Sequence, residues 1–252
     1  MIRSYGSSDT GCLRTQNEDR ILRNDALGLY VVADGMGGHN HGELAAQLAV
    51  EAIQAYVHAS VNYQEITWPF GYDFQRSTNE NRLSNAIRLA SRRVFERARE
   101  TPELDGMGTT VAAALVEDSV ATVASIGDSR VYLYSNGRLE PLTQDDTWVG
   151  TMVRNGVMLE SEVASHPMRN VLTQAAGVRP TIDLHLLERR LSPGDALLLS
   201  SDGLHGVVED RRVAEILASG PKEEASVKGL IEAARQAGAP DNVSCILVRW
   251  SP

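Results

Sequence analysis

Short apolar segments separated by polar turns dominate the hydrophobic pattern of this chain. Segments of strand length lie at Leu29–Ala33, Thr109–Val116, Val120–Ile126, Arg130–Tyr134, Ile182–Leu187, Ala196–Ser200 and Val243–Val248. Gly, Asn, Asp or Pro ends most of them, and the pair Asn136-Gly137 is typical of a two-residue hairpin turn. Because the segments follow one another closely, the pattern predicts antiparallel meanders.

Other segments repeat their apolar residues at helical spacing. They lie at Gly42–Val57, Leu83–Val94, Val213–Leu217 and Val227–Ala234. In the second of them, apolar residues recur at intervals of four, three and four, which places them on one face of a helix. Strands in runs and helices in blocks predict a layered α+β fold rather than a βαβ repeat. We expect one domain over residues 1–252.

Two segments have no regular pattern. Asn62–Asn81 mixes aromatic and polar residues, and we expect it to be a loop between two helices. Asp145–Gly177 contains short helical patterns that Gly156, Pro167 and Gly177 interrupt. A long irregular segment of this kind in a compact domain is often functional, so we expect a flap at 145–177.

Composition and charge narrow the classes of partner. The 252 residues are 42% hydrophobic and 23% charged, as in an ordinary globular protein. The formal net charge is −9, and no block of Lys and Arg occurs. This balance argues against nucleic acid or an anionic membrane as the main partner. Phosphate chemistry stays open, because a bound divalent cation can invert the local charge.

The sequence carries no pattern typical of export or of membrane insertion. The first eleven residues lack the apolar core of a signal peptide, and no run approaches about eighteen consecutive apolar residues. Cys12 and Cys245 lie at opposite ends, and Cys245 stands in the apolar run VSCILV. We therefore expect Cys245 to be a buried small hydrophobe and the chain to be cytoplasmic.

Four aspartates stand out because each lies at the end of an apolar strand segment. These residues are Asp34, Asp128, Asp202 and Asp241. Carboxylates at four strand ends could converge at one sheet edge, where burial is costly unless a cation neutralises them. Oxygen ligands suit Mg²⁺, Mn²⁺ or Ca²⁺ better than zinc. Gly35 would let the main chain turn tightly and offer a bare carbonyl as a further ligand.

A simpler interpretation exists for each of these acids. A single Asp-Gly at a strand end is commonly a turn, and the second DGMG sequence, Asp105–Gly108, is interpreted as one because no apolar strand precedes it. Upstream, Glu18 and Asp19 could complete a metal site, and Arg14 has a planar fork suited to phosphate. Taken alone, the segment RTQNEDR is equally typical of a charged surface.

These segments, in this order, resemble the metal-dependent serine/threonine protein phosphatases of type 2C, in their compact bacterial form. The matching blocks are GCLRTQNEDR, VVADGMGGHNHGELAA, MGTTVAAALV, SIGDSRVYLY, LTQDDTWV, RNVLTQAAG, LLLSSDGL and PDNVSCILV. They extend over nearly the whole chain, from about Thr10 to Val248. The resemblance implies an α-β-β-α sandwich of two central antiparallel sheets flanked by helices, with a binuclear metal centre at one end.

The resemblance also implies a set of metal ligands for two Mn²⁺ or Mg²⁺ ions. Asp34 would bridge both ions, and Asp202 and Asp241 would hold the first. The carbonyl of Gly35 and, through water, Glu18 would hold the second. A water activated by the two ions would attack phosphorus in line, without a phosphoenzyme.

Further positions take supporting roles by the same resemblance. Asp19 would support the metal site without binding an ion directly. Asp128, together with Asp202, would bind a third, weaker ion, as in bacterial members. Arg14 matches the arginine that binds the phosphate. The implied catalytic residues are therefore Arg14, Asp34 and Asp202.

The chain also departs from the family pattern. Eukaryotic members often have histidine directly after Asp-Gly, proposed as the general acid, and Met36 stands there in this chain. His39 and His41 are close in sequence, but we interpret them as loop or helix-cap residues. Asp146 occupies a position where bacterial relatives commonly have histidine, which could alter flap docking or substrate choice.

Two other classes of function are alternatives to a phosphatase. The first is a catalytically silent binding or regulatory module that keeps the phosphatase fold; Asp34, Asp202 and Asp241 are all present, which disfavours it. The second is another phosphoryl-transfer enzyme. No P-loop sequence and no D-x-D triplet occur, and the lack of basic stripes disfavours a nuclease.

The expected partners follow from the implied reaction. They are phosphorylated proteins, among them a Ser/Thr kinase that the enzyme would oppose and the substrates of that kinase. We expect neither nucleic acid nor a membrane as a partner, and a monomer.

Overall fold

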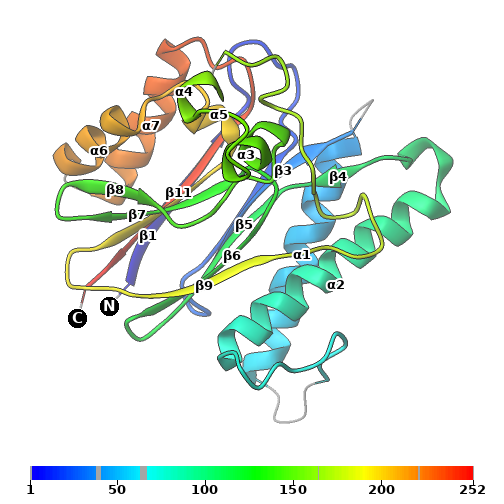
Figure 1. The fold of residues 1–252 in the computed structure, drawn as a ribbon. Coiled ribbons are helices and arrows are strands. Elements are labelled where there is room, and N and C mark those ends of the chain that lie inside the picture. The colour runs from blue at the N-terminus through cyan, green and yellow to red at the C-terminus, as the bar shows by residue number, and fades with distance from the viewer. Residues whose placement is uncertain (1, 38–40, 63–66, 164, 221, 252) are drawn as a thin grey trace.

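Two antiparallel β-sheets lie face to face and carry helices on both outer faces in the computed structural model of the chain (Figure 1). The structure describes residues 2–37, 41–62, 67–163, 165–220 and 222–251. The predicted α-β-β-α sandwich is therefore confirmed.

The first sheet has five strands in the order β1-β11-β10-β7-β8. Their bounds are β1 Ile2–Asp9, β11 Val243–Trp250, β10 Ala196–Ser200, β7 Arg130–Ser135 and β8 Arg138–Pro141. The helices on its outer side are α5 Asp202–His205, α6 Asp210–Ser219 and α7 Glu223–Gln236. One apolar cluster joins the buried faces of α6 and α7 to this sheet.

The second sheet has the order β2-β3-β5-β6-β9, and β4 pairs with the end of β3. Its strands are β2 Asp19–Asn24, β3 Leu29–Met36, β4 Gly108–Thr109, β5 Val111–Glu117, β6 Val120–Ile126 and β9 His185–Arg190. Two long helices, α1 His41–Asn62 and α2 Thr78–Glu100, cover its outer face, and a short 3₁₀ helix follows at Pro102–Leu104.

Strand β3 explains why the apolar run before Asp34 is continuous. Successive side chains of a strand point to opposite faces, and here both faces are covered. Leu29, Val31 and Ala33 pack among the residues of α1 and α2. Tyr30 and Val32 pack between the two sheets. The strand is therefore apolar on both sides until it reaches the open end of the sandwich.

Some elements differ from the sequence prediction. Strands β1 and β2 were not predicted, and the segment that includes Glu18 and Asp19, considered as a charged surface, leads directly into β2. Helix α2 begins at Thr78, inside the predicted loop 62–81, and α1 runs to Asn62. The last strand of the second sheet begins at His185, three residues after the predicted start.

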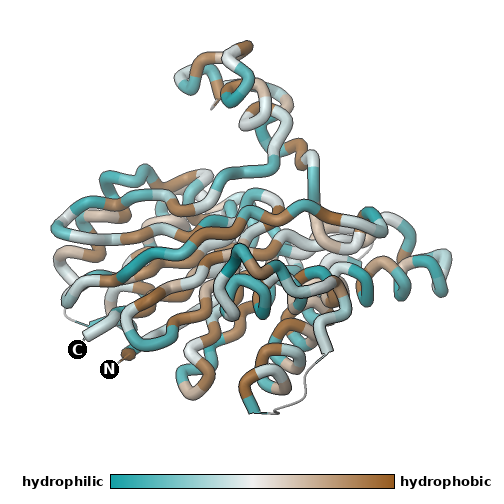
Figure 2. Tube along the Cα trace, turned by 60° about the horizontal axis from the view of Figure 1, so that its bottom comes forward, coloured by the Kyte–Doolittle hydropathy of each residue, from teal (hydrophilic) through white to brown (hydrophobic). Residues whose placement is uncertain are grey.

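The flap segment 145–177 contains two short helices, α3 Trp148–Arg154 and α4 Glu160–Val163. It stands out from the body of the sandwich (Figure 2). Its outer part exposes two large apolar side chains, since Val157 is 73% and Leu159 is 69% exposed. The Trp148 ring stacks on the His166 ring with centroids 5.1 Å apart, which holds the two sides of the segment together.

The other sequence predictions concern the two cysteines, His39 and His41, and membrane-spanning helices. Cys12 is exposed, Cys245 is buried, and both are free thiols; burial raises the pKa of Cys245 to about 12. His41 is the first residue of α1, whereas His39 lies outside the described residues. Across the helices that the structure describes, none is both long and apolar enough for a membrane span.

Candidate metal centre

Asp34 is held at the end of β3 through its backbone. Its N–H donates to Thr110 Oγ1 at 3.0 Å, and its carbonyl accepts from Thr110 N–H and from Thr109 Oγ1, both at 2.9 Å. Asp19, the first residue of β2, lies directly opposite Asp34 in the antiparallel pair. Two carboxylates therefore stand side by side at this edge of the sheet.

Gly35 is required by close packing, rather than by the tight turn that we expected. A Cβ atom at this position would lie 2.0 Å from the carbonyl oxygen of Gly42 and 2.7 Å from that of Glu18. A Cβ atom at Gly42 would in turn lie 2.6 Å from the Gly35 carbonyl. The start of α1 can therefore approach the end of β3 only because both residues lack side chains.

The other predicted aspartates come from the neighbouring strand ends. Asp202 opens α5 directly after β10, and Asp128 lies in the turn between β6 and β7. Asp241 precedes β11 by two residues. Together with Arg14, these three residues line one cleft of about 620 Å³. The predicted convergence of carboxylates at one end of the sandwich is thus what the structure has.

The electrostatics of this cleft are those of crowded carboxylates. Burial raises the pKa of Asp34 well above its usual value, and the charges of Asp19, Asp202, Asp128 and Asp241 raise it further. Burial raises the pKa of Asp19 to about 6 and that of Asp128 to about 7. The pKa of Asp202 is raised by burial and then by Asp241. The cluster therefore favours a proton or a cation.

The donor set fits hard divalent cations. Within the described residues, Asp19 Oδ1 and Asp202 Oδ1 are buried and have no hydrogen-bond partner. All the clustered donors are oxygens, which suits Mn²⁺ and Mg²⁺. However, no group of three or more His, Cys, Asp or Glu side chains in the described part of the chain is already arranged as a metal site. Ion binding would therefore require some carboxylates to rotate.

Arg14 and Asp241 show where such a rotation would occur. Arg14 Nη2 lies 2.7 Å from Asp241 Oδ2, and more than a third of each side chain is exposed. The contact with Asp241 raises the pKa of Arg14. Because a cation and Arg14 would compete for the same carboxylate, this ion pair is the part of the cluster that metal binding would change first.

Asn242, a residue that the sequence analysis did not single out, anchors the loop that carries Arg14 and Glu18. Its side-chain amide donates to the carbonyls of Thr10 and Gln16 at 2.9 and 2.8 Å. Its Oδ1 accepts from the Glu18 N–H at 2.8 Å. A buried amide with all these partners sets the path of the β1–β2 loop. The sequence signal was the Asn that follows Asp241.

Two further groups at the cleft were also missed. Ser201 Oγ donates to Asp19 Oδ2 at 2.8 Å and accepts from the Ser244 N–H at 3.0 Å. Arg130 Nε and Nη2 contact both oxygens of Asp145 at 2.9 and 2.7 Å. The serine next to Asp202 in SSDG, and the arginine two residues after Asp128 in GDSR, are the signals that could have drawn attention to these residues.

His205 also lines the cleft. Burial lowers the pKa of His205 well below its usual value, and the positive charge of Arg130 lowers it further. Its Nδ1 lies 3.2 Å from Ser200 Oγ. The ring is therefore neutral near pH 7.

Asp146 joins three segments. Its Oδ1 lies 2.9 Å from His185 Nε2, and its Oδ2 accepts from the Gly127 N–H at 3.1 Å. Its carbonyl accepts from Thr173 N–H and Oγ1 at 2.7 and 2.9 Å. The base of the flap segment is thus attached to β9 and to the turn that carries Asp128.

Comparison with known proteins identifies this architecture. The family model described as Protein phosphatase 2C matches residues 14–247. The serine/threonine protein phosphatase PstP of Mycobacterium tuberculosis is 35% identical over 250 residues, which are 98% of this chain and 45% of that protein. The chain therefore spans less than half of this curated relative. A serine/threonine phosphatase stp of Listeria innocua is 32% identical over 96% of this chain and 93% of its own length.

Solved structures give the same result. The crystal structure of the M. tuberculosis phosphatase PstP/Ppp has a TM-score of 0.87 and 33% identity, and covers 100% of this chain and 99% of that chain. The PstP catalytic domain in complex with two manganese ions has a TM-score of 0.84 and 32% identity, and covers 100% of this chain and 99% of that chain. The fold, the blocks around the carboxylate cluster and these similarities lead to one conclusion: the chain belongs to the protein phosphatase 2C family.

Proposed function

We propose that the chain is a metal-dependent phosphatase that hydrolyses phosphoserine and phosphothreonine in proteins. The observation that carries this proposal is the cluster of Asp34, Asp128, Asp202 and Asp241 at one end of the sandwich, where burial and mutual repulsion raise the pKa of Asp34, Asp128 and Asp202. Such a cluster is stable in its ionised form when divalent cations neutralise it. Family membership supports the same function.

The proposed ligands are those that the family pattern implies. Asp34 would bridge two ions, with Asp202 and Asp241 on the first and the Gly35 carbonyl and Glu18 on the second. Mn²⁺ or Mg²⁺ bound there would supply positive charge for the phosphoryl oxygens and lower the pKa of water. Support comes from the two-manganese complex of the similar PstP catalytic domain.

Two further positions belong to the same proposal. Asp128 and Asp202 would hold a third, weaker ion. Asp19 faces Asp34 across the β2–β3 pair and would keep the bridging carboxylate in place, since Ser201 already holds one of its oxygens. The backbone contacts of Asp34 with Thr110 would fix its position along β3.

The substrate would bind where Arg14 reaches the cleft. The guanidinium of Arg14 contacts Asp241 and is half exposed, so it can turn to a phosphate and offer two parallel N–H donors. Met36 cannot donate a proton to the leaving alkoxide, and His205 is neutral because its pKa is lowered. Neither residue is therefore the proton donor, and water in the cleft is one donor that could serve instead.

A silent regulatory module is the alternative function. It would keep the fold and lose at least one of the carboxylates that hold the ions. Asp34, Asp202 and Asp241 are all present, and the last two line the same cleft. This favours catalysis over the alternative.

Hydrolysis of p-nitrophenyl phosphate and of a phosphothreonine peptide, with and without Mn²⁺, tests the proposal. We expect EDTA to abolish both activities and Mn²⁺ or Mg²⁺ to restore them. Turnover that persists in EDTA would contradict the metal mechanism. A folded protein that binds Mn²⁺ and hydrolyses neither substrate would support the silent module. A kinase as partner, the monomeric state and a cytoplasmic location stay predictions.

A further inference from the structure

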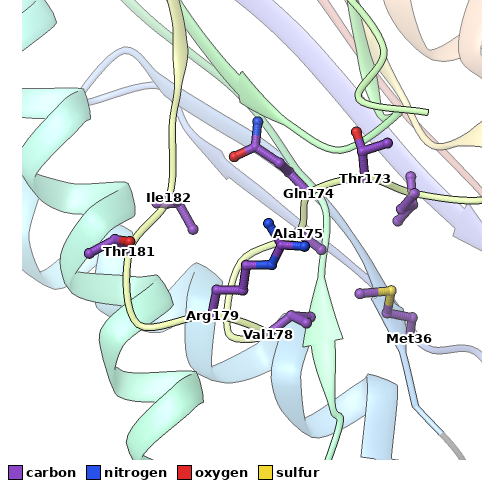
Figure 3. A pocket seen from close by; sticks show the side chains of 9 residues that line it. Met36, Thr173, Gln174, Ala175, Val178, Arg179, Thr181 and Ile182 are labelled. Atoms are coloured by element: carbon purple, nitrogen blue, oxygen red, sulfur yellow. The ribbon is translucent and has the colours of Figure 1, made fainter. Parts of the chain in front are cut away.

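A small cavity lies beside Met36, next to the residues of the candidate metal centre. Its volume is about 120 Å³, well below the roughly 300–1,000 Å³ of pockets that hold small molecules. It is lined by Met36, Leu172, Thr173, Gln174, Ala175, Val178, Arg179, Thr181 and Ile182 (Figure 3). A cavity of this size suits one side chain. We call it the Met36 pocket.

Gly108 lets two lining residues of the pocket, Met36 and Val178, pack closely over β4. A Cβ atom at Gly108 would lie 2.7 Å from Val178 Cγ2 and 3.0 Å from Met36 Cε. Thr109, the next residue of β4, exchanges two backbone hydrogen bonds with Ala176, at 3.0 and 2.8 Å. The loop that carries Val178 is therefore attached to the strand that pairs with Met36, and the pocket is part of the folded body.

The pocket faces the same side of β3 as the carboxylate of Asp34. Residues i and i+2 of a strand project from one face, and both Asp34 and Met36 belong to β3. Their Cα atoms are about 7 Å apart, given a rise of about 3.4 Å per residue. A peptide that presents a phosphorylated side chain to Asp34 would therefore bring a neighbouring side chain to Met36.

Arg179 supplies the charge of this pocket. In the described part of the chain its side chain has no hydrogen-bond or ion-pair partner, and it is exposed. Figure 3 shows its guanidinium reaching toward Gln174 and Ala175, across the pocket from Met36. Two neighbouring polar groups are already used, because Thr173 Oγ1 donates to the Asp146 carbonyl and Gln174 Oε1 accepts from the Asp183 N–H. Arg179 is thus the one cation of the lining that is free to bind.

We propose that the Met36 pocket binds a glutamate side chain of the phosphoprotein substrate, close in sequence to the phosphorylated residue. The two methylene groups would pack against Met36 and Val178, and the carboxylate would pair with Arg179. This inference rests on the proposed phosphatase function and adds a sequence preference to it.

The chemistry of the lining favours glutamate over other occupants. One guanidinium matches one carboxylate through two parallel hydrogen bonds. A second phosphate, with close to two negative charges, would call for more than the single Arg179 cation. A leucine side chain would fill the apolar part but would leave Arg179 without a partner. Aspartate has one methylene fewer to reach across Val178.

The test uses phosphothreonine peptides in which one glutamate is moved from position −3 to +3 in an otherwise neutral sequence. Matched peptides carry glutamine, leucine or phosphoserine at the same place. We expect glutamate at one or two positions to lower KM about two- to fivefold relative to glutamine, as for an ion pair at the edge of a pocket. Arg179→Ala should abolish this preference, and Arg179→Glu should replace it with a preference for lysine.

The controls separate this inference from the proposed function. Arg138→Ala removes another exposed arginine, which lies on β8 in the first sheet, and should keep the glutamate preference. All these variants should hydrolyse p-nitrophenyl phosphate as the wild type does, because that ester carries no carboxylate for Arg179 to bind. An equal glutamate preference in Arg179→Ala, a stronger effect of leucine or phosphoserine, or no preference at all would overturn the proposal. Loss of p-nitrophenyl phosphate hydrolysis in the wild type would instead contradict the phosphatase function itself.

Discussion

Asp146 and His185, 39 residues apart in the chain, meet through a contact of 2.9 Å between Asp146 Oδ1 and His185 Nε2. The second oxygen of Asp146 accepts from the Gly127 N–H, and its own N–H donates to the Gly127 carbonyl at 2.8 Å. One buried carboxylate therefore connects β9, the base of the flap segment and the turn before Asp128. An acid–histidine pair thus attaches the base of the flap segment to β9.

Removing this carboxylate should destabilise the fold measurably. Asp146→Ala leaves the Gly127 N–H buried without its acceptor and removes the partner of His185. We expect the free energy of unfolding to fall by about 1–3 kcal/mol, as judged by guanidinium denaturation. His185→Ala should cost less, because its ring is partly exposed.

The double variant tests whether the two residues act as a pair. If they do, the effects of Asp146→Ala and His185→Ala will differ from additivity by at least about 0.5 kcal/mol. Effects that add within about 0.3 kcal/mol would mean that the contact contributes nothing of its own.

The crowded carboxylates predict how the stability of the metal-free protein depends on pH. Asp19 and Asp128 have a pKa of about 6 and about 7 in the folded protein, above the value of about 3.9 expected for an unfolded chain. The folded state therefore binds more protons than the unfolded state between about pH 4 and pH 7. Stability then falls as pH rises through this window. Asp34 and Asp202, whose pKa values are also raised, act in the same sense.

One group opposes this trend. The pKa of His205 is lowered, so below about pH 6.5 the unfolded state binds more protons at this residue than the folded state. His205 therefore adds stability as pH rises toward about 6.5 and contributes no pH dependence above that value. One histidine faces four carboxyl groups, and the net slope should stay negative. Thermal unfolding in EDTA at several pH values from 5 to 8 measures it, and Asp128→Asn should flatten the curve. A melting temperature that rises steadily from pH 5 to pH 8 would refute this reading.

Arg14 should matter for binding the phosphate more than for the chemical step. Arg14→Ala loses the guanidinium fork at the cleft, and we expect KM for a phosphothreonine peptide to rise about tenfold with a much smaller change in kcat. Arg14→Lys keeps the charge but loses the planar fork, so its KM should lie between that of the wild type and that of Arg14→Ala. Steady-state kinetics at saturating Mn²⁺ measures both parameters. An unchanged KM in Arg14→Ala would remove Arg14 from the phosphate site.

Asp202→Asn should abolish Mn²⁺-dependent turnover and leave the fold intact. The substitution keeps the shape of the side chain but removes the charge that would hold an ion, and we expect a loss of at least about 100-fold in kcat. Asp118→Asn is the matched control, since Asp118 lies in the turn between β5 and β6, at the other end of β6 from Asp128. Asp118 has a φ of 53°, a conformation that asparagine also tolerates. Activity near the wild-type level in Asp202→Asn would show that this carboxylate holds no essential ion.

The parts of the fold that were predicted are those with strong local patterns. β3 and β10 are short apolar runs next to Asp-Gly or Ser-Asp-Gly, so both strands were predicted. The turn expected at Gly35 was wrong, because Asp34 and Gly35 continue β3 to Met36. β1 was missed because its sequence, IRSYGSSD, is mostly polar, as is common in a partly exposed edge strand that pairs only with β11. β2 was missed because charged residues surround its two apolar positions.

The start of α2 was missed although a local signal was present. Ser77 caps the helix and Glu80 completes a capping box, a pattern of serine and glutamate three residues apart that marks a helix start. The mixture of aromatic and polar residues in 62–81 masks this signal. Trp68 and Tyr72 instead form edge-to-face contacts in the loop before the helix.

The candidate site was predictable as a set of acids but not as a network. Asp34, Asp202 and Asp241 each follow or precede an apolar strand, so their convergence could be expected. The burial of Asp19 and the contacts of Asn242 with the β1–β2 loop depend on strands that are distant in sequence. Such contacts cannot be predicted from periodicity along the chain, because the residues that form them come together only in the folded protein.

Anomalous diffraction from crystals soaked in Mn²⁺ tests the central claim most directly. The account predicts two manganese peaks in the cleft, with Asp34 between them and Asp202 and Asp241 on one of them, and with the Arg14–Asp241 contact broken. Carboxylates that stay apart with no manganese peak among them, in crystals of protein that hydrolyses phosphothreonine peptides, would contradict it.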